Sequence, residues 1–258
     1  MNYKLASSPP RIALLACSVF EREIALHAAG ANHIVEVRYF EMGLHDNPGH
    51  MRTVLQEQLE AVDSNPDIDA VVLAYGLCGR GTVGLRPLQH RMIIPRAHDC
   101  ITVFMGSKEA YAEHQHRCPG CYYYTPGWNR NRRVPGPDQL ESMRATLSAK
   151  FEAEDVDYLV QSTREQWALH NQSTYLDLGT DDAEAEAAYA RKCADWLGWK
   201  FERLKGDPAL LRDLLWGIWD DERFQIIEPG SRLVHVPDES IMRAEPVPAP
   251  VSEKQTVS

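Results

Sequence analysis

The sequence predicts an α/β protein made of two Rossmann-like lobes with parallel sheets, joined by a connecting region of helices and loops. Short apolar or β-branched runs alternate with longer segments of helical periodicity, which is typical of parallel strands joined by right-handed crossovers. This alternation occurs in the N-terminal half and again near the C-terminus. A chain of 258 residues can bury one large core or two small ones, and the two separate stretches favour two lobes.

The N-terminal lobe is expected over residues 11–117. Four apolar runs predict strands, at residues 11–17, 33–40, 68–75 and 91–95. Helical spacing follows three of these runs, at residues 18–30, 45–66 and 99–114. The second of these helices has Asn47 as its candidate N-cap and Pro48 at its first position. In the first helix, Glu21 and Glu23 are expected on the solvent-facing side.

The remaining chain divides into three parts. Residues 118–172 form the connecting region, which begins with many turn residues and continues into one or two helices across Leu140–His170. Residues 173–236 form the C-terminal lobe, with strands expected at residues 173–179, 200–204 and 224–230 and helices at residues 180–198 and 207–219. Residues 237–258 have the proline, serine and charge content of a disordered tail.

The net charge of −10, from 27 basic and 37 acidic residues, argues against nucleic acid or an anionic membrane as a partner. The basic cluster at residues 129–134 is expected to be a solvated loop. Although Leu14–Cys17 resembles a lipoprotein cleavage box, the apolar stretch before Cys17 is shorter than the roughly 7 to 15 residues of a signal peptide. We therefore expect a cytoplasmic protein whose six cysteines are thiols, metal ligands or redox groups rather than a disulfide framework.

Three cysteines follow three different strands of the predicted N-terminal sheet. Cys17 comes directly after the first strand, Cys78 comes three residues after Tyr75, and Cys100 comes five residues after Pro95. Since parallel strands all end at the same edge of a sheet, where ligands bind, these thiols are expected to converge. Taken singly, each is better explained as a small buried hydrophobe, but together they favour a functional site.

The chemistry expected of these thiols is metal binding. Cys17 and Cys100 also open helices, whose N-termini favour the thiolate form. Three converging thiolates repel one another unless a cation is present, so we expect zinc, with His98, Asp99 or water as fourth ligand, or an iron-sulfur cluster with one open iron.

Three further segments are candidates for ligand binding. The CxxC pair Cys118 and Cys121 has the spacing of a metal knuckle or a redox motif, or of a tight Pro-Gly turn. The stretch Gly79–Gly84 matches GxGxxG but lacks room for a following helix, so a nucleotide-dependent oxidoreductase is only a third alternative. Two of its three glycines, Gly79 and Gly81, are expected, with the preceding Gly76, to allow close approach to a cofactor, or simply to form a tight loop. In the aromatic stretch Tyr122–Trp128, Tyr124 and Trp128 are expected to contact a flat or methylated ligand, or to pack the lobes together.

As a set, these loops are similar to those of a known family. The matching segments are ACSVFEREI, YGLCGRGTVGL, IPRAHDCITVFMGSKEAY, YYTPGW, YLDLG and DDERFQIIEPG. They resemble the bacterial and archaeal family catalogued as domain of unknown function 1638, over about residues 11–235. The family positions carried over are Cys17, Glu21, Gly76, Cys78, Gly79, Arg96, His98, Asp99, Cys100, Tyr124, Pro126, Gly127 and Trp128.

The resemblance implies a place in one-carbon metabolism, beside corrinoid-dependent methyltransferases. We accordingly expect a metal-thiolate protein acting on a methylated or corrinoid-linked small molecule, with His98 or Asp99 managing a proton. Arg96 is expected to pair with a substrate carboxylate, or with Asp99 or Glu21. The alternative is a non-enzymatic protein that delivers a corrinoid or C1 intermediate to a methyltransferase. The family pattern has no cysteines at Cys118 and Cys121, so it implies no essential role for them.

Overall fold

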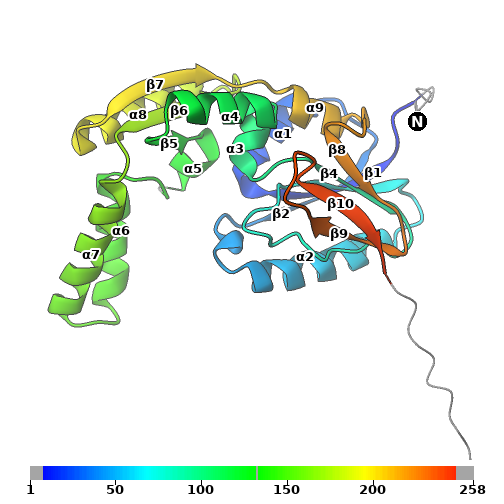
Figure 1. Ribbon diagram of the computed structural model, residues 1–258, viewed down its shortest axis with the longest axis horizontal. Coiled ribbons are helices and arrows are strands. Elements are labelled where there is room, and N and C mark those ends of the chain that lie inside the picture. Colours follow the sequence, from blue (N-terminus) through cyan, green and yellow to red (C-terminus); the bar gives the residue numbers. More distant parts are fainter. Residues whose placement is uncertain (1–7, 132, 248–258) are drawn as a thin grey trace, which may run out of the picture.

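The computed structural model describes residues 8–131 and 133–247 and contains two parallel sheets in separate lobes (Figure 1). In the first sheet the strand order is β2-β1-β3-β4-β8. Its strands are β1 (Ile12–Cys17), β2 (Ile34–Phe40), β3 (Ala70–Ala74), β4 (Arg91–Pro95) and β8 (Phe224–Ile227). The first four are parallel, whereas β8 runs antiparallel to β4. The predicted α/β class with parallel sheets is confirmed.

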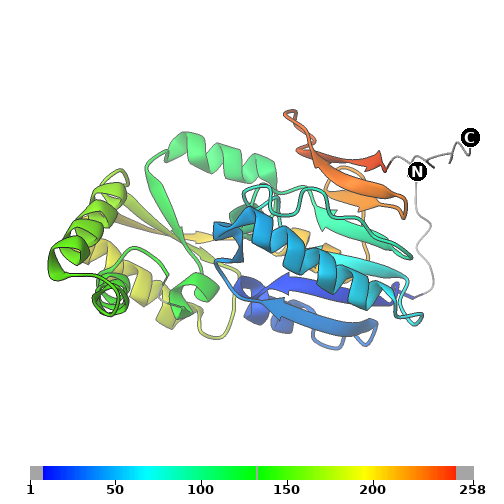
Figure 2. The same ribbon diagram turned by 90° about the horizontal axis from the view of Figure 1, so that it is seen from below.

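Helices cover both faces of this first sheet (Figures 1 and 2). They are α1 (Glu21–His27), which follows a 3-10 turn at Ser18–Phe20, α2 (Pro48–Asp63) and α9 (Ala209–Leu215). In α2 the residues Met51, Leu55 and Leu59 recur every four positions, so they form one buried face against the sheet. The Asn47 side chain accepts a hydrogen bond from the His50 amide at 3.1 Å, as expected of an N-cap.

The segment after β4 forms two helices where the sequence predicted one. These are α3 (Cys100–Met105) and α4 (Lys108–Arg117). Gly106 ends α3 with a φ of 85°, a left-handed conformation that glycine adopts without strain. The Ser107 hydroxyl then caps α4 by accepting a hydrogen bond from the Ala110 amide.

The second lobe is built on a three-stranded parallel sheet in the order β5-β6-β7. Its strands are β5 (Cys121–Tyr124), β6 (Gln172–Asp177) and β7 (Lys200–Lys205), and its helices include α5 (Pro126–Arg130) and α8 (Ala183–Leu197). Tyr124 and Tyr175 pair across β5 and β6 and pack against α8, whereas Tyr123 and Glu202 lie on the α4 side. Strand β5 falls in the segment expected to be turns, because three successive tyrosines favour a strand.

The end of the described chain returns to the first lobe. The strand expected at residues 224–230 as part of the C-terminal lobe instead pairs with β4 as β8. It is followed by a hairpin, β9 (Ser231–His235) and β10 (Met242–Pro246), in which Leu233 and Met242 are fully buried. Residues 237–247 of the expected disordered tail are therefore ordered, and residues 248–258 lie outside the described range.

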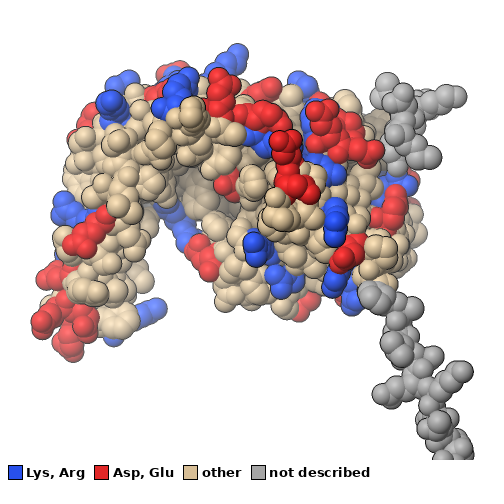
Figure 3. Space-filling view, in the orientation of Figure 1, with Lys and Arg blue, Asp and Glu red and all other residues tan. Residues whose placement is uncertain are grey.

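An arm of two helices, α6 (Pro137–Ser148) and α7 (Ala153–Trp167), projects from the second lobe (Figure 1). The space-filling view is hollowed between this arm and the first lobe (Figure 3). Within residues 8–131 and 133–247, the helices are too short or too polar to cross a membrane.

The two lobes meet where the 3-10 turn that precedes α1 contacts α5. Gly127 allows this contact, since a Cβ there would lie 2.3 Å from the Val19 carbonyl oxygen. Arg133 adds an ion pair of 2.8 Å to Asp46, so at least part of the basic cluster joins the lobes rather than facing solvent alone. Glu23 is fully buried at this junction, and the expectation that it faces solvent is wrong.

Candidate functional site

A cavity of about 550 Å³ lies between the two lobes. Its first wall comes from the loops after β1, β2, β3 and β4, and its second wall from α4, β5, α5 and the start of β6. The first wall contains Cys17, Phe20, His45, Tyr75, Cys78, Gly79, Asp99, Cys100 and Ile101. The second contains Tyr111, Gln115, Pro119, Cys121, Tyr122, Tyr123, Trp128 and His170. This volume is typical of sites for small molecules.

Three thiols face this cavity from three loops of the first sheet. Cys17 is the last residue of β1, Cys78 follows β3, and Cys100 is the first residue of α3. All three are free thiols that line the cavity. The parallel order of β1, β3 and β4 brings these sequence-distant residues together, because the carboxyl ends of the strands share one edge.

The loop that carries Cys78 is held in a strained conformation. Cys78 has a φ of 46° and Arg80 a φ of 71°, values that are uncommon for residues other than glycine. Gly76 packs against the next loop so closely that a Cβ would lie 2.7 Å from the Asp99 amide nitrogen. Such strain is commonly found at functional sites, where the surrounding structure imposes it.

Burial makes the three thiols poor acids. It raises the pKa of Cys17 to about 11 and that of Cys78 to about 12, and it raises the pKa of Cys100 well above its usual range. Repulsion among the three thiolates and from Asp99 adds to this effect. The expectation that helix N-termini favour thiolates is therefore wrong, because desolvation outweighs the helix dipole. A bound cation would reverse this balance.

Two neighbours act directly on Cys100. The Trp128 side chain forms a hydrogen bond with its thiol, which favours the thiolate. The Asp99 carboxylate accepts hydrogen bonds from the amide and hydroxyl of Thr102 at 3.0 and 3.2 Å, and so caps α3 while it also lines the cavity. One Asp99 oxygen is thus committed to the helix N-terminus.

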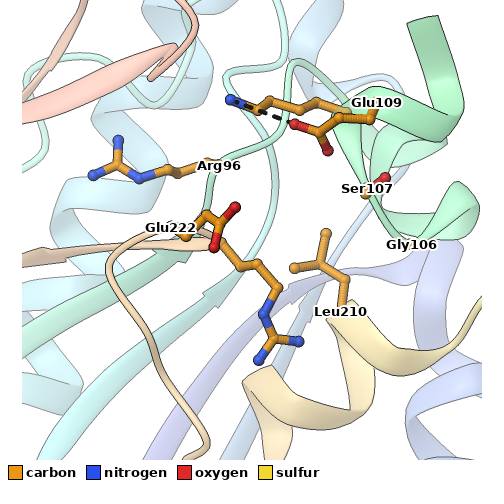
Figure 4. Close-up of a pocket in the computed structure, with 8 residues that line it drawn as sticks. Arg96, Gly106, Ser107, Glu109, Leu210 and Glu222 are labelled. Atoms are coloured by element: carbon orange, nitrogen blue, oxygen red, sulfur yellow. Dashed lines mark ion pairs between the residues drawn. The ribbon is translucent and has the colours of Figure 1, made fainter. Parts of the chain in front are cut away.

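His98 and Arg96 do not line the cavity, although both were expected in the site. His98 is exposed, and its backbone carbonyl accepts a hydrogen bond from the Cys78 amide. Arg96 lies in a separate pocket of about 50 Å³ beside Ser107 and Glu222 (Figure 4). Its guanidinium donates to the carbonyls of Asp221, Ser240 and Met242 and to the side chain of Gln225. Arg96 therefore ties the C-terminal hairpin to β4, and its guanidinium is committed neither to a substrate nor to Asp99 or Glu21.

The residues expected to bind a cofactor are also divided. Gly79 and Trp128 line the cavity. Gly76 and Gly81 instead permit close packing, Gly81 against the Met51 sulfur. Tyr124 is fully buried in the second lobe, where its hydroxyl donates a hydrogen bond of 2.6 Å to the Pro135 carbonyl. No helix follows the GxGxxG loop, which therefore lacks the helix N-terminus that holds a pyrophosphate.

Sequence reasoning missed Tyr75 on the first wall and Tyr111, Gln115 and His170 on the second, and it chose Tyr124 of the aromatic stretch instead of Tyr122 and Tyr123. Tyr75, Tyr111, Tyr122 and Tyr123 make the cavity strongly aromatic, and Cys121 lies on the second wall. The tyrosine run after Cys121 was the available signal, but the strand that presents it was not predicted.

Among the described residues, no three His, Cys, Asp or Glu side chains already stand in a metal-coordinating arrangement. A family model described as "Protein of unknown function (DUF1638)" matches residues 39–215, which is more than half of the chain. No curated protein and no solved structure matches the chain.

Proposed function

The chain belongs to the DUF1638 family, and from the cavity between its lobes we propose that it holds zinc or an iron-sulfur cluster on Cys17, Cys78 and Cys100. The observation that carries this proposal is that three thiols from three separate loops line one cavity. Sulfur is the donor that both groups prefer, and three thiolates leave one coordination position for a substrate. When bound, such a centre supplies Lewis-acid or electron-transfer chemistry.

The protein's own residues prepare this site in two ways. Buried neutral thiols keep the apo cavity free of uncompensated charge, and binding of a cation releases their protons. The Trp128 hydrogen bond then stabilises the Cys100 thiolate. Asp99, beside Cys100, lies on the cavity wall, where it can accept a substrate proton.

The aromatic side chains that line the cavity favour a methylated small molecule as the substrate. Tyr75, Tyr111, Tyr122, Tyr123 and Trp128 surround the cavity, and aromatic faces attract methylated ammonium groups by cation-π interaction. A corrinoid is larger than the ligands that a cavity of about 550 Å³ encloses, so it would act from a partner protein. We propose that the protein acts in cytoplasmic one-carbon metabolism, beside a corrinoid protein or methyltransferase, as its family resemblance implies.

Metal analysis and an absorption spectrum of anaerobically purified protein test the proposal. We expect stoichiometric zinc without colour, or iron and sulfide with a brown chromophore. Cys17→Ser, Cys78→Ser and Cys100→Ser should each lose the metal, whereas Cys118→Ser is the matched control and should retain it. A protein that takes up no metal even after reconstitution would contradict the proposal.

The second candidate is a non-enzymatic carrier of a methylated or C1 compound, and the aromatic lining of the cavity is what favours it. A titration with glycine betaine, monitored by tryptophan fluorescence, distinguishes the carrier from the metal centre. Equal affinity in the wild type and the three serine variants would support the carrier. Weaker binding in those variants, but not in Cys118→Ser, would support the metal centre.

A further inference from the structure

A second pair of thiols lies on the wall opposite the three-cysteine site. Cys118 ends α4 and Cys121 begins β5, and Pro119 and Gly120 form the turn between them. The Cys121 amide donates a hydrogen bond of 3.2 Å to the Cys118 carbonyl, which closes the turn. The two thiols lie close enough for the charge of Cys118 to raise the pKa of Cys121 further, beyond the larger effect of burial. Cys118 is partly exposed, whereas Cys121 is buried and lines the cavity.

A buried imidazole lies beside this pair. The His114 Nδ1 atom lies 3.8 Å from the Cys121 sulfur and 2.7 Å from the Tyr123 hydroxyl. Its Nε2 atom lies 2.9 Å from a carboxylate oxygen of Glu202. A carboxylate at Nε2 favours the tautomer with a proton on that nitrogen, so Nδ1 carries the lone pair, which accepts a hydrogen bond from the Tyr123 hydroxyl and lies next to the Cys121 thiol. Thiol, imidazole and carboxylate thus follow the order of a nucleophile, its base and the group that orients the base.

The carboxylate is itself held in place. Gln172 donates a hydrogen bond of 2.9 Å to Glu202, and Arg117 lies 3.3 Å from its other oxygen. Burial raises the pKa of the Cys121 thiol to about 11, so this thiol needs a base to react near neutral pH. His114 is the base within reach.

We propose that Cys118 and Cys121 form a thiol-disulfide exchange site, in which His114 takes the proton of Cys121. The reaction needs a low-molecular-weight disulfide as co-reactant. Cys118 attacks one sulfur of that disulfide, and the first thiol leaves with the Cys118 proton. Cys121, deprotonated by His114, then attacks the Cys118 sulfur and releases the second thiol, which takes the proton from His114. The chain loses two hydrogen atoms and gains one disulfide, while the co-reactant is reduced to two thiols.

The position of the pair links it to the cavity. Tyr111 and Cys121 both line the cavity, and the pKa of Tyr111 is raised by burial and by the charges of Cys121 and Cys100. Cys121 therefore opens onto the cavity, whereas Cys118, which attacks the disulfide first, is partly exposed outside its lining. The proposal requires no metal at the three-cysteine site and stands apart from the function proposed above.

Thiol trapping tests the exchange site directly. Trypsin cleaves after Arg117 and Arg130, so one peptide, residues 118–130, contains both cysteines of the pair and no other. The full chain is equilibrated anaerobically, with a metal chelator, in mixtures of glutathione and glutathione disulfide, then quenched with acid, alkylated and analysed by mass spectrometry. We expect the doubly alkylated peptide to convert to an unalkylated one, lighter by two hydrogen atoms before alkylation, with a single midpoint. Full alkylation in every mixture, or a disulfide from Cys121 to a cysteine outside this peptide, would overturn the proposal.

The role of His114 is tested by the rate of exchange against pH. His114→Gln, and the milder Glu202→Gln, should slow exchange by about 100-fold near pH 7, the usual contribution of a positioned base. The inflection caused by the imidazole should also disappear. The other groups facing the pair are Tyr111, Tyr123, Gln115 and Arg117, which both variants leave in place. His116→Gln, an exposed histidine of the same helix, is the matched control. An unchanged rate and pH profile in folded His114→Gln would refute its role as the base.

Discussion

Glu23 should make the protein less stable as the pH rises, and Glu23→Gln should remove this effect. Its side chain is fully buried where the two lobes meet, and in the described residues neither carboxylate oxygen meets a hydrogen-bond partner in another residue. Arg130 lies close enough to attract its charge but already bonds Asp182 at 2.9 Å. Burial accordingly raises the pKa of Glu23 from 4.5 to about 7.

The size of the effect on the free energy of unfolding follows from this shift in the pKa of Glu23. Below pH 4.5 the carboxyl is protonated in both the folded and the unfolded chain, so it has no effect on the pH dependence of stability. Between pH 4.5 and about 7 the unfolded chain ionises first, and the free energy of unfolding falls. A pKa of about 7 in place of 4.5 corresponds to about 3 kcal/mol lost above pH 7. Glutamine stays neutral, so Glu23→Gln should match the wild type at pH 4.5 and exceed it by about 3 kcal/mol at pH 8.

Urea unfolding at a series of pH values, followed by tryptophan fluorescence under reducing conditions, measures this difference. Glu21→Gln is the matched control, because Glu21 is exposed two residues earlier in α1. It should change the free energy of unfolding by less than about 0.5 kcal/mol at any pH. If the wild type and Glu23→Gln lose stability in parallel between pH 4.5 and 7, the reasoning about burial is refuted.

Three further predictions concern the walls of the site and their support. Gly76→Ala places a Cβ 2.8 Å from the Ala97 carbonyl oxygen, so it should destabilise the protein by about 2 kcal/mol in urea unfolding and weaken metal uptake. Asp63→Ala removes the carboxylate that accepts hydrogen bonds from three successive amides, residues 88–90, and should cost about 3 kcal/mol while leaving the metal content of the folded protein unchanged. Trp128→Phe removes a hydrogen bond to the Cys100 thiol, so alkylation of that thiol by iodoacetamide at pH 9 should slow by roughly tenfold; an equal or faster rate would contradict this assignment.

The convergence of the three thiols could be deduced from strand order alone. Cys17, Cys78 and Cys100 each follow a strand, and in a parallel sheet this position determines the edge at which a residue lies. Their high pKa values could not be deduced in the same way, since desolvation depends on how the second lobe closes over them. The same holds for Glu23, whose helix has no apolar pattern that would reveal a buried carboxylate.

The second wall of the cavity was beyond sequence reasoning for a different reason. Strand β5 is a short edge strand, and its register against β6 is set by tertiary contacts such as the packing of Tyr124 on α8. Arg96 was misplaced because its partners lie near residues 221–242, in a hairpin that local periodicity did not connect to β4. Pairing between residues this far apart in the sequence does not alter the local hydrophobic periodicity, so the periodicity could not reveal it.

The chain returns to the first lobe to form β8, and this return determines the order in which the two sheets can be completed during synthesis. The second sheet is encoded by one continuous stretch, from Cys121 to Lys205, and can close as soon as that stretch has left the ribosome. The first sheet must wait for Phe224–Ile227, and its cover α9 is also made late. During synthesis, therefore, the first sheet, whose loops carry Cys17, Cys78 and Cys100, is completed after the second, when almost all of the described chain has been made.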